Sequence, residues 1–466
     1  METLNEARSA APPTANKVPL ARQIAWGCGG AADNVLYNGL NTLLMPIFNV
    51  GMGLDAVKLG YIFGLPRFFD AVTDVVIGNV SDNARTRWGR RRPFIFAGVL
   101  LSALFMGLLF SAPMSLHGTA IYAYLFFASA FFYISYAIFV IPYSALGFEL
   151  SSDYSERTRV LAWRMYLGLV AGLGVPWLYK LSFVINSNEV IGARTVAWII
   201  ALIVVVLGLV PVFFVREPEQ GVRGHAMPFL QSLWVTLRNR SFLLLTGSGL
   251  FILLGLFLAG PFSLYLNIYY VYAGQREAAA NMMGFANTFG MFCGLAGLPV
   301  ATWLGSLYGK RRVALVLVVA VLASVPLTWW CFNPVRPWLQ LLPTFVLHFS
   351  INGAFLLSSS MLADVCDEDE LHTGLRREGI YSAASEFGKK CAIAFSTIVS
   401  GYVLAVSGFD AKLPVQLTAT VTNLRIGYIV ILGVTLGLGG LFLFLYPLTH
   451  GRAAEIRRIL DQRARK

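Results

Sequence analysis

The stretch DAVTDVVIGNVSDNARTRWGRRRPF, residues 70–94, combines two features that rarely occur together. Its first half continues an apolar run long enough to cross a membrane, yet it carries Asp70 and Asp74. Five arginines then follow within residues 85–92, and the chain turns apolar again after Pro93. A spanning helix that buries carboxylates and ends in a basic loop indicates a membrane protein with a charged interior.

The whole chain is more apolar than a soluble protein. Hydrophobic residues make up 57% and charged residues 13% of its 466 residues, whereas a soluble domain carries about 25% charged residues. Apolar runs recur along nearly the whole length, and each can cross a hydrocarbon core about 30 Å thick. A membrane β-barrel would instead alternate polar and apolar residues in strands of about ten residues. The sequence therefore predicts an all-α integral membrane protein.

The remaining composition excludes several other classes. The five cysteines (Cys28, Cys293, Cys331, Cys366 and Cys391) are scattered without a paired spacing, so neither a disulfide framework nor a structural metal site is expected. Residues 1–20 lack the apolar core of a signal peptide and predict a disordered tail. No cofactor is expected.

Apolar runs bounded by charges, proline or glycine predict twelve transmembrane helices. Their expected ranges are 21–48, 58–81, 93–113, 119–148, 160–183, 195–215, 241–271, 280–306, 312–332, 338–363, 379–405 and 423–448. An even number of spans places both termini on one side. Of the 36 lysines and arginines, 25 fall on the side of the termini and seven on the other, so the positive-inside rule makes that side cytoplasmic. The net charge of +12 thus reflects topology, and no nucleic-acid partner is expected.

The chain divides into two halves that share a pattern. The predicted organisation is an N-terminal six-helix bundle (21–215), a cytoplasmic linker (216–240), a C-terminal six-helix bundle (241–448) and a basic cytoplasmic tail (449–466). RTRWGRRRPF follows the second span, and GSLYGKRRVAL follows the second span of the other half. Basic loops are common on cytoplasmic sides, but matched glycine–arginine turns at the same place favour parallel repeats. Such repeats characterise the major facilitator fold.

The second span places Arg67, Asp70 and Asp74 on one helical face. A charge at the centre of an isolated spanning helix costs about 2.5–3.5 kcal/mol, so these side chains must face the protein interior. A structural ion pair between Arg67 and one aspartate is one interpretation. One arginine cannot neutralise two carboxylates, however, and the surplus negative charge predicts that Asp70 and Asp74 bind a coupling cation, H⁺ or Na⁺.

Polar side chains in three other spans are candidates for binding a substrate. The first span carries Asp33, Asn34, Tyr37 and Asn38, whose amides and hydroxyl suit a hydroxyl-rich ligand, and Asn41 continues the stripe. Hydrogen bonding between packed helices is the alternative, and it stays open for Asn41. The eleventh span carries Glu386 and Lys390 one turn apart. Arg164, early in the fifth span, either joins this set or extends to the membrane interface.

Three separated motifs carry a family resemblance. RFFDAVTDVVIGNVSDNARTRWGRRRPFI, IPYSALGFELSSDYSERTR and MLADVCDEDELHTGLRREGIYSAASEFGKK resemble the signatures of the glycoside–pentoside–hexuronide:cation symporters, which include melibiose permease. The resemblance covers the whole chain and implies cation-coupled symport of a sugar or glycoside across the bacterial inner membrane by a monomer.

The resemblance also implies roles for single residues. Asp70 and Asp74 match the paired carboxylates of the cation site, and Lys390 matches a lysine near it. Asn34 and Arg164 match positions of the sugar site, and Arg67 and Tyr143 complete the expected substrate-binding set. Val140 and Ser144 stand where melibiose permease has an aspartate and a tryptophan, so its galactoside pocket does not carry over. More distant relatives carry lysophospholipids, which makes an amphipathic non-sugar substrate the alternative.

The basic loop is expected to form part of a cytoplasmic gate, as in the family. The expected gate residues are Asp82, Arg90, Arg91, Glu149, Arg157, Asp364 and Arg377, with pairs from Asp82, Arg90 and Arg91 to acids of the other cytoplasmic loops, Glu149 and Asp364 among them. Cation and substrate would together shift the population between outward-open and inward-open states. An enzyme would need a clustered catalytic constellation and a channel a repeated filter or charged ring. Neither pattern is visible in the sequence.

Overall fold

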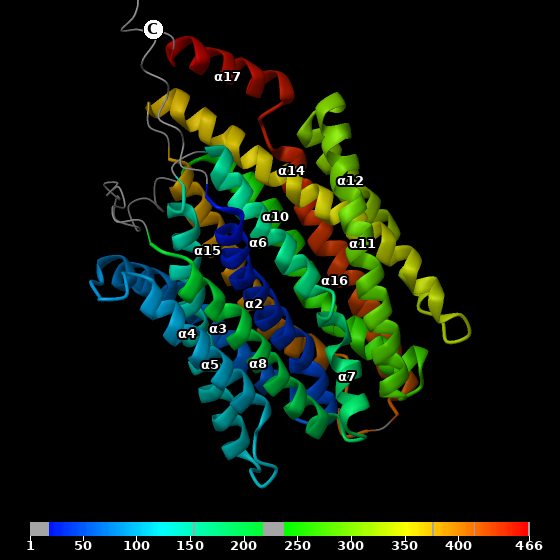
Figure 1. Cartoon of the computed structure of the whole chain (residues 1–466). Helices are drawn as coiled ribbons and strands as arrows, with labels where there is room; N and C mark the ends of the chain where they lie inside the picture. Colours follow the sequence, from blue (N-terminus) through cyan, green and yellow to red (C-terminus); the bar gives the residue numbers. More distant parts are fainter. Residues whose placement is uncertain (1–17, 152–153, 218–236, 375–376, 414, 465–466) are drawn as a thin grey trace, which may run out of the picture. The chain divides into compact units, whose positions relative to one another are not determined.

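The computed structural model describes residues 18–151, 154–217, 237–374, 377–413 and 415–464. These residues form helices and connecting turns without a β-strand (Figure 1). Most of the expected N-terminal tail and most of the expected linker lie outside the described residues. The first helices are α2 (Leu20–Leu44), η1 (Met45–Gly51), α3 (Ala56–Asn83), α4 (Arg92–Phe110), α5 (Thr119–Glu149), α6 (Tyr154–Gly172), η2 (Val175–Trp177), α7 (Leu178–Ile185) and α8 (Glu189–Phe214).

The chain continues with a second series of helices. These are α10 (Arg240–Tyr265), η3 (Leu266–Val271), α11 (Arg276–Tyr308), α12 (Lys310–Ser324), α13 (Thr328–Cys331), η4 (Pro337–Gln340), α14 (Leu341–Thr373), α15 (Glu378–Val406), α16 (Thr418–Leu445) and α17 (His450–Ala464). The basic tail after residue 449 is largely helical, since it forms α17. Ile456 of this helix is 1% exposed, whereas Arg452, Arg457 and Arg458 are exposed.

Nine helical segments of the described residues are long and apolar enough to cross a membrane. They correspond to nine of the twelve expected spans. The other three correspond to α2, α3 and α12. Polar or charged side chains interrupt the apolar surface of α2 and α3, whereas α12 has only 15 residues and ends before Pro326. The all-α membrane fold is confirmed, and the count of twelve spans stays a prediction.

Two expected spans and one expected loop differ from the structure. The fifth span is broken at Gly172–Gly174 into α6, η2 and α7, where Pro176 cannot continue a helix. The ninth span is broken in the same way at Pro326. The acidic segment after residue 363, expected as a loop, instead extends α14 to Thr373, and the helix ends at Gly374 in a left-handed conformation (φ 70°).

The matched glycine turns have matched backbones. Gly89 has φ 108° and lies just before α4, and Gly309 has φ 89° and lies directly before α12. Both dihedrals fall where side chains with a Cβ are strained. In both halves, the first helix ends in a π-helical turn, η1 or η3. Each π turn holds an asparagine that is 1% exposed, Asn49 or Asn267. The sequence similarity between the halves therefore extends to backbone conformation.

The residues group into two compact units that do not follow the expected halves. The first unit contains Met1–Thr42, Val72–Leu178 and Ala193–Arg223, and the second contains Leu43–Ala71, Tyr179–Gly192 and Gly224–Lys466. In the first unit, Trp26 and Tyr143 are buried and their rings stack at 5.1 Å. In the second unit, a large apolar core joins α10, α12, α14 and α16. Two segments of the N-terminal half, 43–71 and 179–192, thus pack with the C-terminal half.

Candidate transport site

A seam of small residues brings α3 against α15 within the second unit. A Cβ added to Gly60 would lie 3.0 Å from the carbonyl oxygen of Thr397, and one added to Gly64 would lie 3.0 Å from that of Ala394. Such contacts require glycine, because the two backbones approach each other directly. The residue numbers rise along α3 as they fall along α15, so the helices are antiparallel.

The alignment of α3 against α15 brings a carboxylate of one helix next to an ammonium group of the other. Asp70 lies six residues after Gly64 on α3, and Lys390 lies four residues before Ala394 on α15. The Lys390 ammonium donates to Oδ2 of Asp70 at 2.7 Å. The Asp70 side chain is only 5% exposed, and that of Lys390 is 30% exposed. The pair therefore joins a deeply buried carboxylate to a cation that still contacts open space.

Arg67 contributes a second positive charge beside this pair. Its side chain is buried, it interacts electrostatically with Asp70, and its guanidinium lies 5.8 Å from the centre of the Phe257 ring. The Oδ1 atom of Asp70 has no hydrogen-bond partner within the described part of the chain. A buried carboxylate oxygen in this situation is suited to a proton or a small cation. Asp74 lies one turn further along α3, in the first unit, and is partly buried.

We expect Gly64→Leu to reduce cation-driven uptake strongly. The larger side chain would collide with the Ala394 carbonyl and push α3 away from α15, which would separate Asp70 from Lys390. Gly78→Leu is the matched control, because a Cβ there would have its nearest neighbour at 3.6 Å, an ordinary contact. Initial uptake rates, normalised to the amount of folded protein, would measure the effect. Equal rates in both variants would contradict the role of the seam.

A second polar cluster lies in the first unit. The Arg164 guanidinium donates to Oδ2 of Asp33 at 3.0 Å, and the Tyr136 hydroxyl donates to Oδ1 at 2.8 Å. The guanidinium also lies 5.2 Å from the centre of the Tyr143 ring and 5.9 Å from that of Trp26. α6 therefore directs Arg164 to the aspartate of α2, and Arg164 is not at an interface position on the outside of the bundle.

The other expected substrate residues of the first unit have different surroundings. The Asn34 amide lies against α6, where a Cβ on Gly172 would be 3.0 Å from its Oδ1. Asn38 is exposed, and Tyr37 stacks on Tyr136 at 5.9 Å. The Asn41 amide donates to the backbone of Tyr37 at 2.7 Å. Tyr143 is fully buried and donates to the Trp26 carbonyl at 2.8 Å, so in this conformation it holds α5 against α2.

Glu386 and Lys390, which lie one turn apart on α15, have different ion-pair partners. Glu386 binds Lys389 at 2.7 Å, whereas Lys390 binds Asp70. Residues 386 and 389 are three apart and share a helix face, so a local pair forms at the surface. Lys390 is directed to α3 by the glycine seam, which sequence spacing on α15 alone does not reveal.

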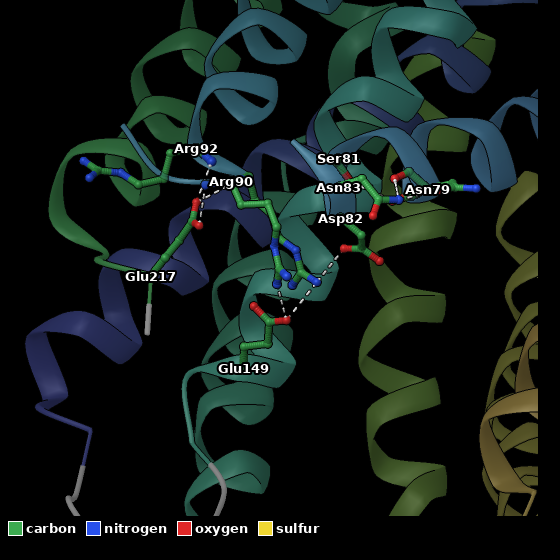
Figure 2. A network of polar contacts seen from close by, with 10 residues as sticks. Asn79, Ser81, Asp82, Asn83, Arg90, Arg92, Glu149 and Glu217 are labelled. Carbon is green, nitrogen blue, oxygen red and sulfur yellow. Dashed lines mark hydrogen bonds and ion pairs between the residues drawn. The ribbon is translucent and has the colours of Figure 1, made fainter. Parts of the chain in front are cut away.

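Charged residues at the end of α3, before α4, at the end of α5 and after α8 form a compact network in the first unit (Figure 2). Arg90 binds Glu149 at 2.6 Å, and Arg91 binds both Glu149 at 2.9 Å and Asp82 at 2.8 Å. The carboxylate of Glu217 accepts hydrogen bonds from the backbone amides of Arg90, Arg91 and Arg92 at 2.7–2.8 Å. Glu217 thus caps the N-terminus of α4, where a negative charge is favourable.

Two of the remaining expected gate residues, Asp364 and Arg377, form ion pairs within the second unit. Asp364 binds Lys310 at 2.8 Å, and Arg377 binds Asp369 at 2.5 Å. The hydrogen bond to the Asp369 carboxylate raises the pKa of Arg377. The expected pairing of Asp364 with the arginines after α3 therefore differs from its observed partner, because α12 places Lys310 next to α14. The side chain of Arg157 lies outside the described residues.

Several residues of these networks were not identified from the sequence. Tyr136 and Glu217 are the clearest cases, together with Lys310 and Asp369. Glu217 lies in REPE, directly after a predicted span, which is where an acidic residue could cap a neighbouring helix. Tyr136 has no such signal, because aromatic residues are frequent throughout α5.

Comparisons with known proteins agree with this architecture. Residues 25–450 match the family described as MFS/sugar transport protein. An inner membrane symporter of Escherichia coli strain K12 is 26% identical over 86% of this chain and 85% of its own length. A glucuronide carrier protein homologue of the same strain is 25% identical over 94% of this chain and 95% of its own. The isoprimeverose transporter of Lactiplantibacillus pentosus is 23% identical over 92% of this chain and 89% of its own.

Solved structures support the fold. A nucleoside transporter, in its D323A mutant, superposes with a TM-score of 0.66 at 14% identity, covering 91% of this chain and all of that one. A bacterial homologue of the human lysosomal transporter Spinster, inward-facing and unoccupied, gives 0.65 at 15% identity, with 94% and 97% covered. These are transporters rather than enzymes. The chain therefore belongs to the MFS/sugar transport protein family, among the glycoside–pentoside–hexuronide:cation symporters.

Proposed function

We propose that the chain is a secondary active transporter that carries a sugar or glycoside together with H⁺ or Na⁺ by alternating access. Curated relatives are named for glycosides, glucuronide, isoprimeverose and sulfoquinovose, which are all sugar derivatives. These names favour a sugar over the amphipathic, lysophospholipid-like alternative. The proposed setting is the bacterial inner membrane, with twelve spans in two six-helix halves and both termini in the cytoplasm, in agreement with the distribution of basic residues.

The observation that carries this proposal is the buried pair of Asp70 and Lys390. One carboxylate oxygen of Asp70 binds the ammonium, and the other has no hydrogen-bond partner within the described residues. Cation binding would reduce the attraction of Asp70 for Lys390 and let the lysine move. A change of charge at this seam would therefore change how α3 packs on α15. Asp74, on the same helix, is proposed as the second cation-binding carboxylate.

The cluster of Asp33, Arg164 and Tyr136 is proposed as the sugar-binding group of the first unit. It offers a carboxylate acceptor, a guanidinium donor and two aromatic rings close to one another. Asn34, Tyr37 and Asn38 extend it along α2. This combination suits hydroxyl groups and an apolar sugar face. The network of Asp82, Arg90, Arg91 and Glu149 is proposed as the cytoplasmic gate.

We propose the proton as the coupling ion. Val140 lies on α5 where melibiose permease has a further aspartate, and Na⁺ prefers several oxygen ligands whereas a proton needs one carboxylate. We expect accumulation in proteoliposomes under an inward pH gradient without sodium, and none under a sodium gradient at constant pH. Accumulation driven only by sodium would contradict proton coupling and would assign the site to Na⁺.

The substrate itself can be found by ligand stabilisation. A ligand that binds only the folded protein raises the apparent melting temperature, and the shift grows with the ratio of its concentration to its Kd. Purified protein would be screened against neutral and acidic mono- and disaccharides and a lysophospholipid, at two pH values with and without sodium. Stabilisation by a sugar supports the proposal. Stabilisation by the lysophospholipid alone would contradict it.

A further inference from the structure

Two ion pairs join residues 179–192 to the start of α11 within the second unit. Glu189, at the start of α8, binds Arg276, and Lys180 of α7 binds Glu277. Residues 179–192 come from the N-terminal half of the chain and α11 from the C-terminal half. The sequence patterns above single out none of these residues. Each side contributes one acid and one base, so the positive partner of one pair lies on the opposite side from the positive partner of the other.

The acidic partner of the Glu189–Arg276 pair is buried, whereas the Arg276 side chain is 31% exposed. The Glu189 side chain is 6% exposed, its Oε1 binds Arg276, and its Oε2 accepts a hydrogen bond from the Tyr179 hydroxyl at 2.9 Å. Removing one partner from a buried ion pair leaves a charge without compensation. The Lys180 pair is more open, since the Glu277 side chain is 61% exposed, and exposed pairs contribute little. The Glu189–Arg276 pair is therefore the stronger connection.

A helix cap beside Glu189 and a backbone turn before Arg276 hold the two residues in place. On one side, Asn188 caps α8 by accepting the amide of Val190 at 3.0 Å. On the other side, Ala273 (φ 48°) and Gly274 (φ 91°) form a left-handed turn directly before α11. Ala273 is the one described non-glycine residue with a positive φ. Such a conformation persists only where the surrounding structure requires it.

Neighbouring contacts connect the same segments. The Tyr265 hydroxyl, at the end of α10, donates to Oδ1 of Asn49 in η1 at 2.6 Å. Gly51, at the end of η1, lies against Glu189, because a Cβ there would be 3.2 Å from the Glu189 Oε1. The end of the first helix, the start of α8 and the start of α11 therefore meet at one place.

This junction also borders open space. A cavity of about 540 Å³ is lined by Phe183, Ser187, Gln275, Arg276, Glu277 and Asn281, among others. Water can therefore reach the charged groups when the segments separate, which lowers the penalty for breaking the pairs. The ion pairs hold the junction closed, and water can hydrate the charged groups when the segments separate. A contact that must close and open reversibly needs both properties.

We propose that the Glu189–Arg276 pair is the extracellular latch of the transport cycle, with Lys180–Glu277 as its weaker companion. The latch is closed in the conformation described here and must open before substrate can enter from outside. This inference rests on the proposed function, which supplies the alternating cycle and the orientation. The latch would close the transporter on the membrane face opposite the proposed cytoplasmic gate.

Accessibility of a buried cysteine tests the latch without substrate or coupling ion. Ala279, three residues after Arg276 on α11, is 0% exposed and would be replaced by cysteine. Intact cells would be treated with a membrane-impermeant thiol reagent, and labelling at this position would be quantified by peptide mass spectrometry. We expect slow labelling in A279C alone and labelling roughly tenfold or more faster when Glu189→Arg is added, since facing arginines favour the open state. Glu189→Gln should give a smaller increase.

The charge-swapped protein separates a latch from a general loss of structure. Adding Arg276→Glu to Glu189→Arg restores opposite charges and should return labelling towards the A279C rate, with uptake partly recovered. Lys180→Glu is the matched reversal in the exposed pair and should have the smaller effect. Unchanged labelling in all single reversals would overturn the latch, and so would labelling that the swap leaves high. Because no transport is measured in the labelling assay, failure of sugar symport would be recognised separately in the uptake experiments.

Discussion

Asp70→Asn should abolish cation-driven accumulation while leaving the fold intact. The substitution removes the charge that binds both Lys390 and the proposed cation, so an imposed gradient could no longer drive uptake. Lys390 would keep partial contact with open space, because its side chain is 30% exposed, and it could be hydrated there. Asp74→Asn should likewise abolish accumulation. Uptake into proteoliposomes under imposed H⁺ and Na⁺ gradients would measure the loss, and full concentrative uptake by either variant would contradict the shared cation site.

Variants of Lys390 distinguish coupling from stability. Lys390→Gln leaves Asp70 at 5% exposure without its ammonium, and breaking a buried pair in this way costs about 3–5 kcal/mol. The neighbouring charge of Arg67 should keep the loss at the lower end. The double variant Asp70→Asn, Lys390→Gln should recover most of the stability but no accumulation. Lys389→Gln, which removes the same charge one residue earlier at the surface, is the control for both measurements. Equal melting temperatures for Lys390→Gln and Lys389→Gln would show that the buried pair does not stabilise the protein.

Arg164→Lys should weaken substrate binding by roughly 10- to 150-fold, the range expected for losing a charge-assisted hydrogen bond of about 1.5–3 kcal/mol. A lysine keeps the charge but cannot reproduce the planar guanidinium that contacts Asp33 and lies over Tyr143 and Trp26. The substitution should raise the KM for uptake more than it lowers the maximal rate. It should also leave coupling to the cation intact.

Substrate-induced stabilisation would measure this affinity once a substrate is known. Arg159→Lys is a suitable control, because Arg159 lies on the same helix and its side chain is 62% exposed. Asp33→Asn should weaken binding as Arg164→Lys does, since both act on one ion pair. Native affinity in Arg164→Lys would mean that this cluster holds α2 and α6 together and does not bind substrate.

Much of the candidate site was predictable because charged residues in a membrane helix are exceptional. Asp70, Asp74, Arg164 and Lys390 are conspicuous in apolar runs, and their residue types suffice to mark an interior polar site. Partners were harder to predict. The family resemblance placed Lys390 near the carboxylates of α3, but helical spacing on α15 by itself does not identify its partner, Asp70, 320 residues earlier. Helical periodicity relates neighbours on one helix and carries no information about the facing helix.

The sequence by itself determined the membrane class, the polar interior and the repeated sequence pattern of the two halves. These properties follow from local chemistry: hydrocarbon excludes charge, and a basic loop with a glycine turn looks the same in both halves, as Gly89 and Gly309 show. The tertiary structure decided how α3 and α15 align and which individual atoms of these charged groups are in contact. Gly60 and Gly64 let α3 approach α15 and so set the register of Asp70 on Lys390. The tertiary structure also brings Glu189 next to Arg276. Contacts between distant segments depend on how their backbones pack, and the sequence of a single segment does not specify that packing.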